Sequence, residues 1–136
     1  MGLLGFDVLT AINKKITVET QMERLADQVC EACNHNATKL TEDEIYELLP
    51  EISDWQLKVV DAIPHMSRIY RFSNFAKALA FTNRVGELAE QVGHHPAITS
   101  EWGRVTVEWW SHEIGGLHKT DFILAARTDD CFNVPD

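Results

Sequence analysis

Segments whose hydrophobic residues recur with the period of a helix alternate along the chain with segments that have the period of a strand. The helical period is clearest in residues 73–93. Ser73 suits the residue that caps the start of a helix, and Gly93 suits the residue that follows its end. Between them the apolar positions recur three or four residues apart and fall on one face: Phe75, Ala78, Leu79, Thr82, Val85, Ala89 and Val92. This pattern predicts the longest helix of the protein, packed on the core through that face.

Shorter helices are predicted on both sides of this one. Thr41 and Glu44 have the spacing of a capping box, in which each side chain bonds the other residue's backbone N–H. Pro50 cannot continue a helix, so we expect this helix to cover residues 42–49. Residues 118–130 follow a pair of glycines and predict the last helix.

A period of two, typical of strands, separates the helices. Four segments show it: 55–62 and 66–72 around a turn at 61–64, and 96–102 and 104–112 around Gly103 and Arg104. Hairpins and helices in this order predict an α+β fold, a four-stranded antiparallel sheet with helices packed on one face as a two-layer α-β sandwich. We assign this single domain to residues 41–136 and interpret residues 1–40 as an N-terminal extension, partly disordered.

Composition narrows the class of function. A net charge of −9 argues against direct binding to nucleic acid or to an anionic membrane surface, since both need a Lys/Arg-rich surface. No apolar run approaches the roughly 18 residues that span a bilayer. The three cysteines form no disulfide framework, so we expect a cytoplasmic protein. Cys30 and Cys33, with His35, supply only half of a structural zinc site and are interpreted as surface thiols, and Cys131 has no evident role.

Three of the six histidines, His94, His95 and His112, fall within one stretch of 23 residues, 90–112. If Gly103 and Arg104 form a two-residue loop, His95 lies opposite His112 at the open end of the second hairpin. Side chains in such positions have Cβ atoms about 4.5–5.5 Å apart. The strand period turns Ile98, Val105, Val107 and Trp109 toward the helices and leaves Thr106, Glu108, Trp110 and His112 on the other face.

Neighbouring imidazoles with pKa values near 6.5 can donate and accept protons near neutral pH, which suits acid–base catalysis. Spacing alone leaves open a metal site and a set of polar turn residues without function. A zinc site needs three or four converging ligands, and neither an HExxH motif nor a paired CxxC accompanies these histidines.

Residues 41–130 resemble the pterin-4a-carbinolamine dehydratases, especially their bacterial-type members. The resemblance lies in Glu90-x-x-x-His94-His95-Pro96, in Ser111-His112-Glu113 and in Gly116-Leu117-x-x-x-Asp121. It extends to Trp55, to Phe72-x-x-Phe75 and to the hairpin sequence EWGRVTVEWWSH.

This resemblance implies a hydro-lyase that dehydrates 4a-hydroxytetrahydropterin to quinonoid dihydropterin, without a metal or a redox cofactor. His94, His95 and His112 are implied as catalytic residues, with Glu90 and Asp121 as supporting carboxylates. The residues implied to bind the pterin are Trp55, Pro96, Ser111, Glu113 and Ile114. Judged by position alone, Asp121 could orient an imidazole or cap the last helix, Glu90 could be merely solvated, and Trp110 could flank the pterin or form a subunit contact.

The resemblance also implies a homodimer or homotetramer and a functional link to an aromatic amino-acid hydroxylase. A second candidate of a different class is a non-catalytic dimerisation cofactor, a protein-binding role that some relatives have. A metal-dependent hydrolase is the third, and it would require a bound ion.

Overall fold

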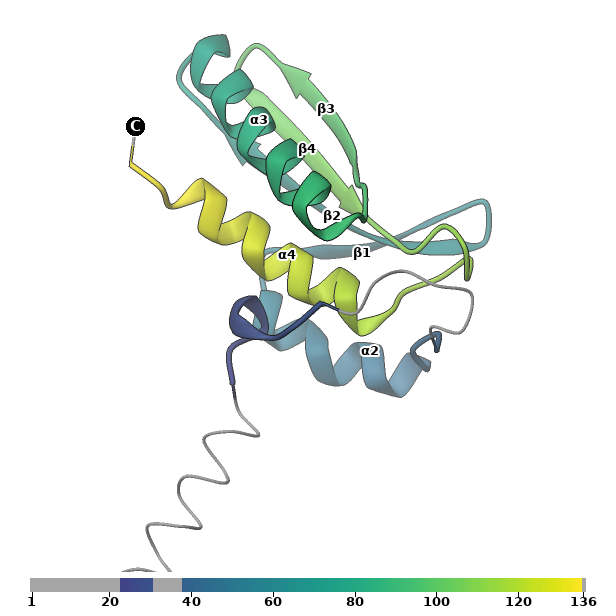
Figure 1. The fold of residues 1–136 in the computed structure, drawn as a ribbon. Coiled ribbons are helices and arrows are strands. Elements are labelled where there is room, and N and C mark those ends of the chain that lie inside the picture. The colour runs from purple at the N-terminus through teal and green to yellow at the C-terminus, as the bar shows by residue number, and fades with distance from the viewer. Residues whose placement is uncertain (1–22, 31–37, 136) are drawn as a thin grey trace, which may run out of the picture.

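The computed structural model describes residues 23–30 and 38–135 and has one antiparallel sheet with α3 and α4 packed on the same face (Figure 1). The spatial strand order is β1-β2-β4-β3. The strands are β1 (Gln56–Val60), β2 (Ile63–Arg71), β3 (Ala97–Glu101) and β4 (Arg104–Trp109). The helices are α2 (Glu42–Leu48), α3 (Phe75–Val92) and α4 (Lys119–Phe132), with 3₁₀ turns η1 (Leu25–Asp27) and η2 (Leu49–Ile52). The predicted α+β class is confirmed.

The helix ends follow the predicted chemistry with one shift. Thr41 and Glu44 form the capping box of α2. The cap of α3 is Asn74, whose side chain accepts the N–H of Lys77, and not Ser73 as predicted. Gly93 ends α3 with φ of 67°, a left-handed conformation that costs glycine no Cβ clash.

The core forms between α3, α4 and the inner face of the sheet. The buried stripe of α3 consists of Ala78, Phe81, Val85 and Ala89. Phe75 and Leu79, predicted for this stripe, are 44% and 43% exposed, because the helix turns Phe81 inward and carries those two side chains outward. The prediction for β4 is confirmed, since Val105, Val107 and Trp109 are fully buried.

The first hairpin is tighter than predicted. Its turn is Asp61 and Ala62, both with positive φ, and β2 already begins at Ile63. The prediction that this strand begins at residue 66 was therefore wrong. Pro64 is tolerated because it lies near the start of the strand, where a missing backbone N–H does little harm. The earlier start brings His65 into the sheet.

The second hairpin has a different register from the predicted one. Glu101 pairs with Arg104, so the loop is Trp102 and Gly103. Glycine suits position 103 because its backbone approaches Phe72, whose carbonyl oxygen would lie 3.0 Å from a Cβ there. Every cross-strand pair therefore moves by two residues, and the predicted pairing of His95 with His112 is wrong. A shift of two keeps each side chain on its predicted face.

Residues 23–30, part of the predicted N-terminal extension, pack against α4 (Figure 1). Leu25 is only 3% exposed. The Arg127 guanidinium donates to the backbone oxygens of Ala26 and Gln28 at 3.0 and 2.6 Å. One cation on α4 thus holds two carbonyls of this segment.

Candidate active site

The carboxylate of Asp121 is the centre of the site. It is fully buried in the first turn of α4. One oxygen, Oδ1, lies 2.7 Å from His94 Nε2, and the other accepts the Ser111 hydroxyl at 2.7 Å and the His118 backbone N–H at 2.9 Å. Asp121 therefore both orients an imidazole and caps the last helix, the two roles that sequence position left open.

Three elements that are distant in the sequence deliver these groups. His94 follows directly on the glycine that ends α3, and its imidazole stacks on the buried Trp109 of β4 at a centroid distance of 5.6 Å. Ser111 follows β4 and forms a backbone bridge with Gly116, which closes the loop that contains His112. Asp121 thus ties the chain after α3 to the chain after β4.

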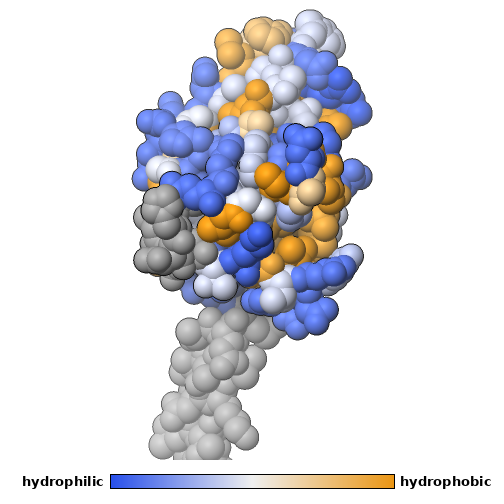
Figure 2. Space-filling view, turned by 90° about the vertical axis from the view of Figure 1, so that its right-hand side faces the viewer, coloured by the Kyte–Doolittle hydropathy of each residue, from blue (hydrophilic) through white to orange (hydrophobic). Residues whose placement is uncertain are grey.

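This arrangement decides where the other two histidines lie. His95 and His112 each follow directly on a residue whose side chain bonds Asp121, and both are exposed. His95 precedes the start of β3 and His112 follows the end of β4, so the antiparallel pairing of these strands and the bonds to Asp121 together place both backbones at the same end of the sheet. Figure 2 faces this end of the molecule, where hydrophobic residues reach the surface between hydrophilic ones.

His95 has a carboxylate partner of its own. Its Nε2 lies 2.6 Å from Glu90 Oε1, and both side chains are largely exposed. A carboxylate accepts the imidazole N–H, which leaves Nδ1 of the neutral ring as the proton-accepting atom. Glu90 therefore contacts one of the three predicted catalytic histidines, His95, directly.

Some of the predicted pterin-binding residues lie beside this cluster. Ser111 bonds Asp121, and Pro96, Glu113 and Ile114 are sequence neighbours of His95 and His112 that are half-buried or exposed.

Trp55, which the resemblance implies as a pterin-binding residue, lies in the core of the chain, and its part in pterin binding stays a prediction. Trp55 is 4% exposed, and its indole N–H donates to Asp129 Oδ1 at 3.0 Å. Asp129 lies eight residues after Asp121 on α4, about 12 Å farther along the helix axis. The same oxygen accepts the Tyr70 hydroxyl at 2.5 Å, and burial together with this carboxylate raises the pKa of Tyr70. Trp55 therefore belongs to a core hydrogen-bond cluster.

A fourth histidine at this end, His65, was missed by the sequence reasoning. It is 5% exposed, and its ring stacks on Trp110 at a centroid distance of 3.8 Å and an interplanar angle of 4°. Trp110 also contacts the His112 ring at 4.2 Å. The signal that could have revealed His65 is the strand period, which extends through residues 63–71 once the turn is confined to two residues.

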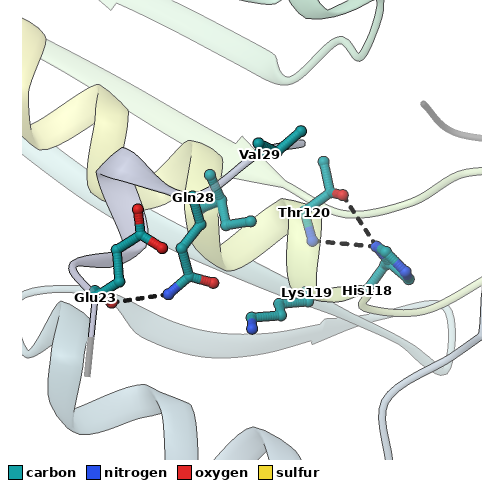
Figure 3. A pocket seen from close by; sticks show the side chains of 7 residues that line it. Glu23, Gln28, Val29, His118, Lys119 and Thr120 are labelled. Atoms are coloured by element: carbon teal, nitrogen blue, oxygen red, sulfur yellow. Dashed lines mark hydrogen bonds between the residues drawn. The ribbon is translucent and has the colours of Figure 1, made fainter. Parts of the chain in front are cut away.

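A separate cavity of about 370 Å³ lies beside the start of α4 (Figure 3). Its lining includes Gln28, His118, Lys119 and Thr120 but none of the three clustered histidines. His118 faces Thr120 there, as the cap of α4.

No three His, Cys, Asp or Glu side chains converge as metal ligands within residues 23–30 and 38–135. Cys33 and His35 lie outside these ranges. Burial raises the pKa of the Cys30 and Cys131 thiols, which disfavours their reactive thiolate forms. In the same part of the chain, no helix is both long and apolar enough to cross a membrane.

Known proteins with similar sequences point to one family. The family model described as "Pterin 4 alpha carbinolamine dehydratase" matches residues 38–131. A protein of Nitrosococcus oceani, named as a pterin-4-alpha-carbinolamine dehydratase, is 55% identical over 108 residues, which cover 79% of this chain and 96% of that protein. A protein of the same name from Syntrophotalea carbinolica is 56% identical over the same length and the same shares of both chains.

Solved structures have the same fold. A protein from Brucella melitensis, described as a transcriptional coactivator/pterin dehydratase, is 29% identical, with a TM-score of 0.63, over 69% of this chain and 98% of its own. A pterin dehydratase-like RuBisCO assembly factor of the α-carboxysome shares the fold at 22% identity and a TM-score of 0.50, over 60% of this chain and 93% of its own. The chain belongs to the pterin-4a-carbinolamine dehydratase family.

Proposed function

We propose that this protein dehydrates 4a-hydroxytetrahydropterin to quinonoid dihydropterin by histidine acid–base catalysis. The observation that carries the proposal is the double attachment of Asp121 to His94 and Ser111, which leaves His95 and His112 exposed at one end of the sheet. Membership of the family supports the substrate class.

The reaction needs two proton transfers and no change of oxidation state. The C4a–O bond breaks as an acid protonates the departing hydroxyl, which leaves as water. A base removes the N5 proton, and the electrons of that N–H bond form the C4a=N5 double bond. Imidazoles near neutral pH suit both steps.

We assign the base to His95 and the acid to His112. Glu90 supports the assignment of His95, because a carboxylate that accepts the Nε2–H favours the tautomer in which Nδ1 can accept a proton. His94 is buried and bonded to Asp121, so it positions the loop and the pterin. Glu113, Ile114 and Pro96 border the substrate in this proposal.

The direct test is the decay of the carbinolamine's ultraviolet absorbance after an aromatic amino-acid hydroxylase has produced it. We expect decay to accelerate in proportion to added protein, both with and without chelator. Decay at the uncatalysed rate would overturn the proposal, and loss of acceleration only with chelator would favour a metal-dependent enzyme. The same assay reproduces the proposed role of the protein, which is to recycle the pterin cofactor of such a hydroxylase.

The second candidate, a protein-binding role, has one observation in its favour. Phe75 and Leu79 on α3 and Trp102 at the hairpin tip expose large apolar surfaces, Trp102 to 71%. We propose that this apolar surface forms the contact between copies of the chain in a homodimer or homotetramer. The Brucella relative's description names a coactivator as well, so a protein without dehydratase activity in the assay above would favour this second role.

Replacement of Trp55 by Phe separates a core role from a pterin-binding role. We expect it to lower the free energy of unfolding by about 1–2 kcal/mol, since the indole bond to Asp129 and some volume are lost. The dehydration rate per folded molecule should stay unchanged. Urea denaturation and the carbinolamine assay measure the two effects, and a large rise in KM without loss of stability would return Trp55 to the substrate site.

A further inference from the structure

His65 is buried on the face of the sheet that the helices leave open. It alternates along β2 with Met66, which belongs to the core, and is nevertheless only 5% exposed. Lys58 lies directly opposite on β1, and its Nζ forms an ion pair of 3.0 Å with Glu108 on β4, the strand on the other side of β2. Side chains on the open face therefore enclose this imidazole.

The ring of His65 forms one end of an aromatic column. It lies parallel to the Trp110 indole at 3.8 Å, while the His112 ring lies 4.2 Å from the same indole at an angle of 39°. Both histidine rings therefore contact the same indole, His65 by parallel stacking and His112 at a tilt.

The environment of His65 suits packing better than proton transfer. Its Nδ1 has no hydrogen-bond partner among the described residues, and the nearest carboxylate oxygen, Glu108 Oε2, is 3.9 Å away. Burial lowers the pKa of His65, as do Lys58 and His112, while Glu108 acts in the opposite direction. The ring is therefore uncharged near neutral pH and presents a flat, rigid surface.

We propose that His65 is a positioning residue that fixes the imidazole of His112 through the indole of Trp110. His65 is anchored within β2, where it pairs with Lys58 of β1, and the ladder between β2 and β4 begins at the next residue, Met66. With one face of the indole blocked by His65, Trp110 cannot rotate away from His112, and the exposed His112 ring keeps one orientation. The catalytic consequence rests on the proposed function, whereas the positioning itself does not.

The positioning is tested by NMR on the full chain without ligand. His65→Leu keeps apolar volume but removes the flat surface, and His65→Phe keeps both. We expect the ring protons of His112, shifted by the indole, to move toward their unstructured positions in the leucine variant and to stay in place in the phenylalanine variant. Trp110→Leu should move them as well, and adding His65→Leu to it should then have no further effect.

Dehydration supplies the second readout. We expect His65→Leu to lower kcat about tenfold with little change in KM, which is less than the ~10²-fold loss a misplaced reacting group can cause, and His65→Phe to restore it. Unchanged His112 resonances in a folded His65→Leu protein would overturn the proposal. If that variant does not fold, unchanged His112 resonances in Trp110→Leu would overturn it equally. If the His112 resonances respond to the variants as expected but the protein has no dehydratase activity, only the proposed function is refuted.

Discussion

Replacement of His112 or of His95 by alanine is expected to lower the rate of carbinolamine dehydration by about 10²–10⁴-fold, the contribution typical of a positioned proton donor or acceptor. Both side chains are exposed, so neither supports the core. The melting temperature should therefore stay close to that of the unmodified protein. Pre-steady-state decay of the carbinolamine, with circular dichroism on the same samples, measures both quantities.

A matched control is available in the same protein. His118→Asn removes an imidazole six residues from His112 but keeps a side chain that can cap α4, and it should leave the rate unchanged. The double variant of His95 and His112 should fall little below the slower single variant, because both groups act in one reaction. Near-normal rates in either single variant would contradict the assignment of that histidine.

Replacement of Asp121 by alanine is expected to cause the largest loss of stability of any single change in the site, about 3–5 kcal/mol. Three donors converge on this buried carboxylate, and its removal leaves the Ser111 hydroxyl, the His94 ring and the first turn of α4 without their acceptor. A domain of this size is stable by only about 5–15 kcal/mol, so a loss this large leaves little stability. Asp121→Asn is a milder change, because it replaces one carboxylate oxygen, an acceptor, by an NH₂ group, a donor.

Asp130→Ala on the same helix is the control for this experiment. Its carboxylate is 54% exposed and pairs with Arg24 at the surface, so its loss should cost less than about 1 kcal/mol. Urea denaturation compares the variants. An Asp121→Asn protein as stable and as active as the Asp130→Ala protein would show that the carboxylate does not organise the site.

The features that depend only on neighbouring side chains could be predicted from the sequence. The capping box at Thr41 follows from side chains three residues apart, and the inward direction of Val105 and Val107 follows from strand alternation alone. The register of the second hairpin could not be predicted in the same way, because Trp102-Gly103 and Gly103-Arg104 are both acceptable two-residue loops. The loop is also bonded to Phe72, 31 residues earlier, whose N–H donates to the Gly103 carbonyl at 2.8 Å, a contact that a local pattern does not contain.

The candidate site shows the same division. His94, His95 and His112 were proposed from spacing and resemblance, but spacing did not show that the Asp121 carboxylate on α4 bonds His94 and Ser111, the residues beside His95 and His112. Trp55 was assigned to the pterin by resemblance, although its partner Asp129 holds it in the core. Both differences arise from tertiary hydrogen bonds to α4, which a local pattern does not contain.

Histidine ring resonances followed during titration with a 7,8-dihydropterin test the central claim most directly. If Asp121 gathers His95 and His112 around the substrate, both should shift together and saturate at one pterin concentration, while His118 in the cavity of Figure 3 stays unchanged. Saturable shifts of His118 with His95 and His112 unmoved would place the pterin elsewhere and contradict the account.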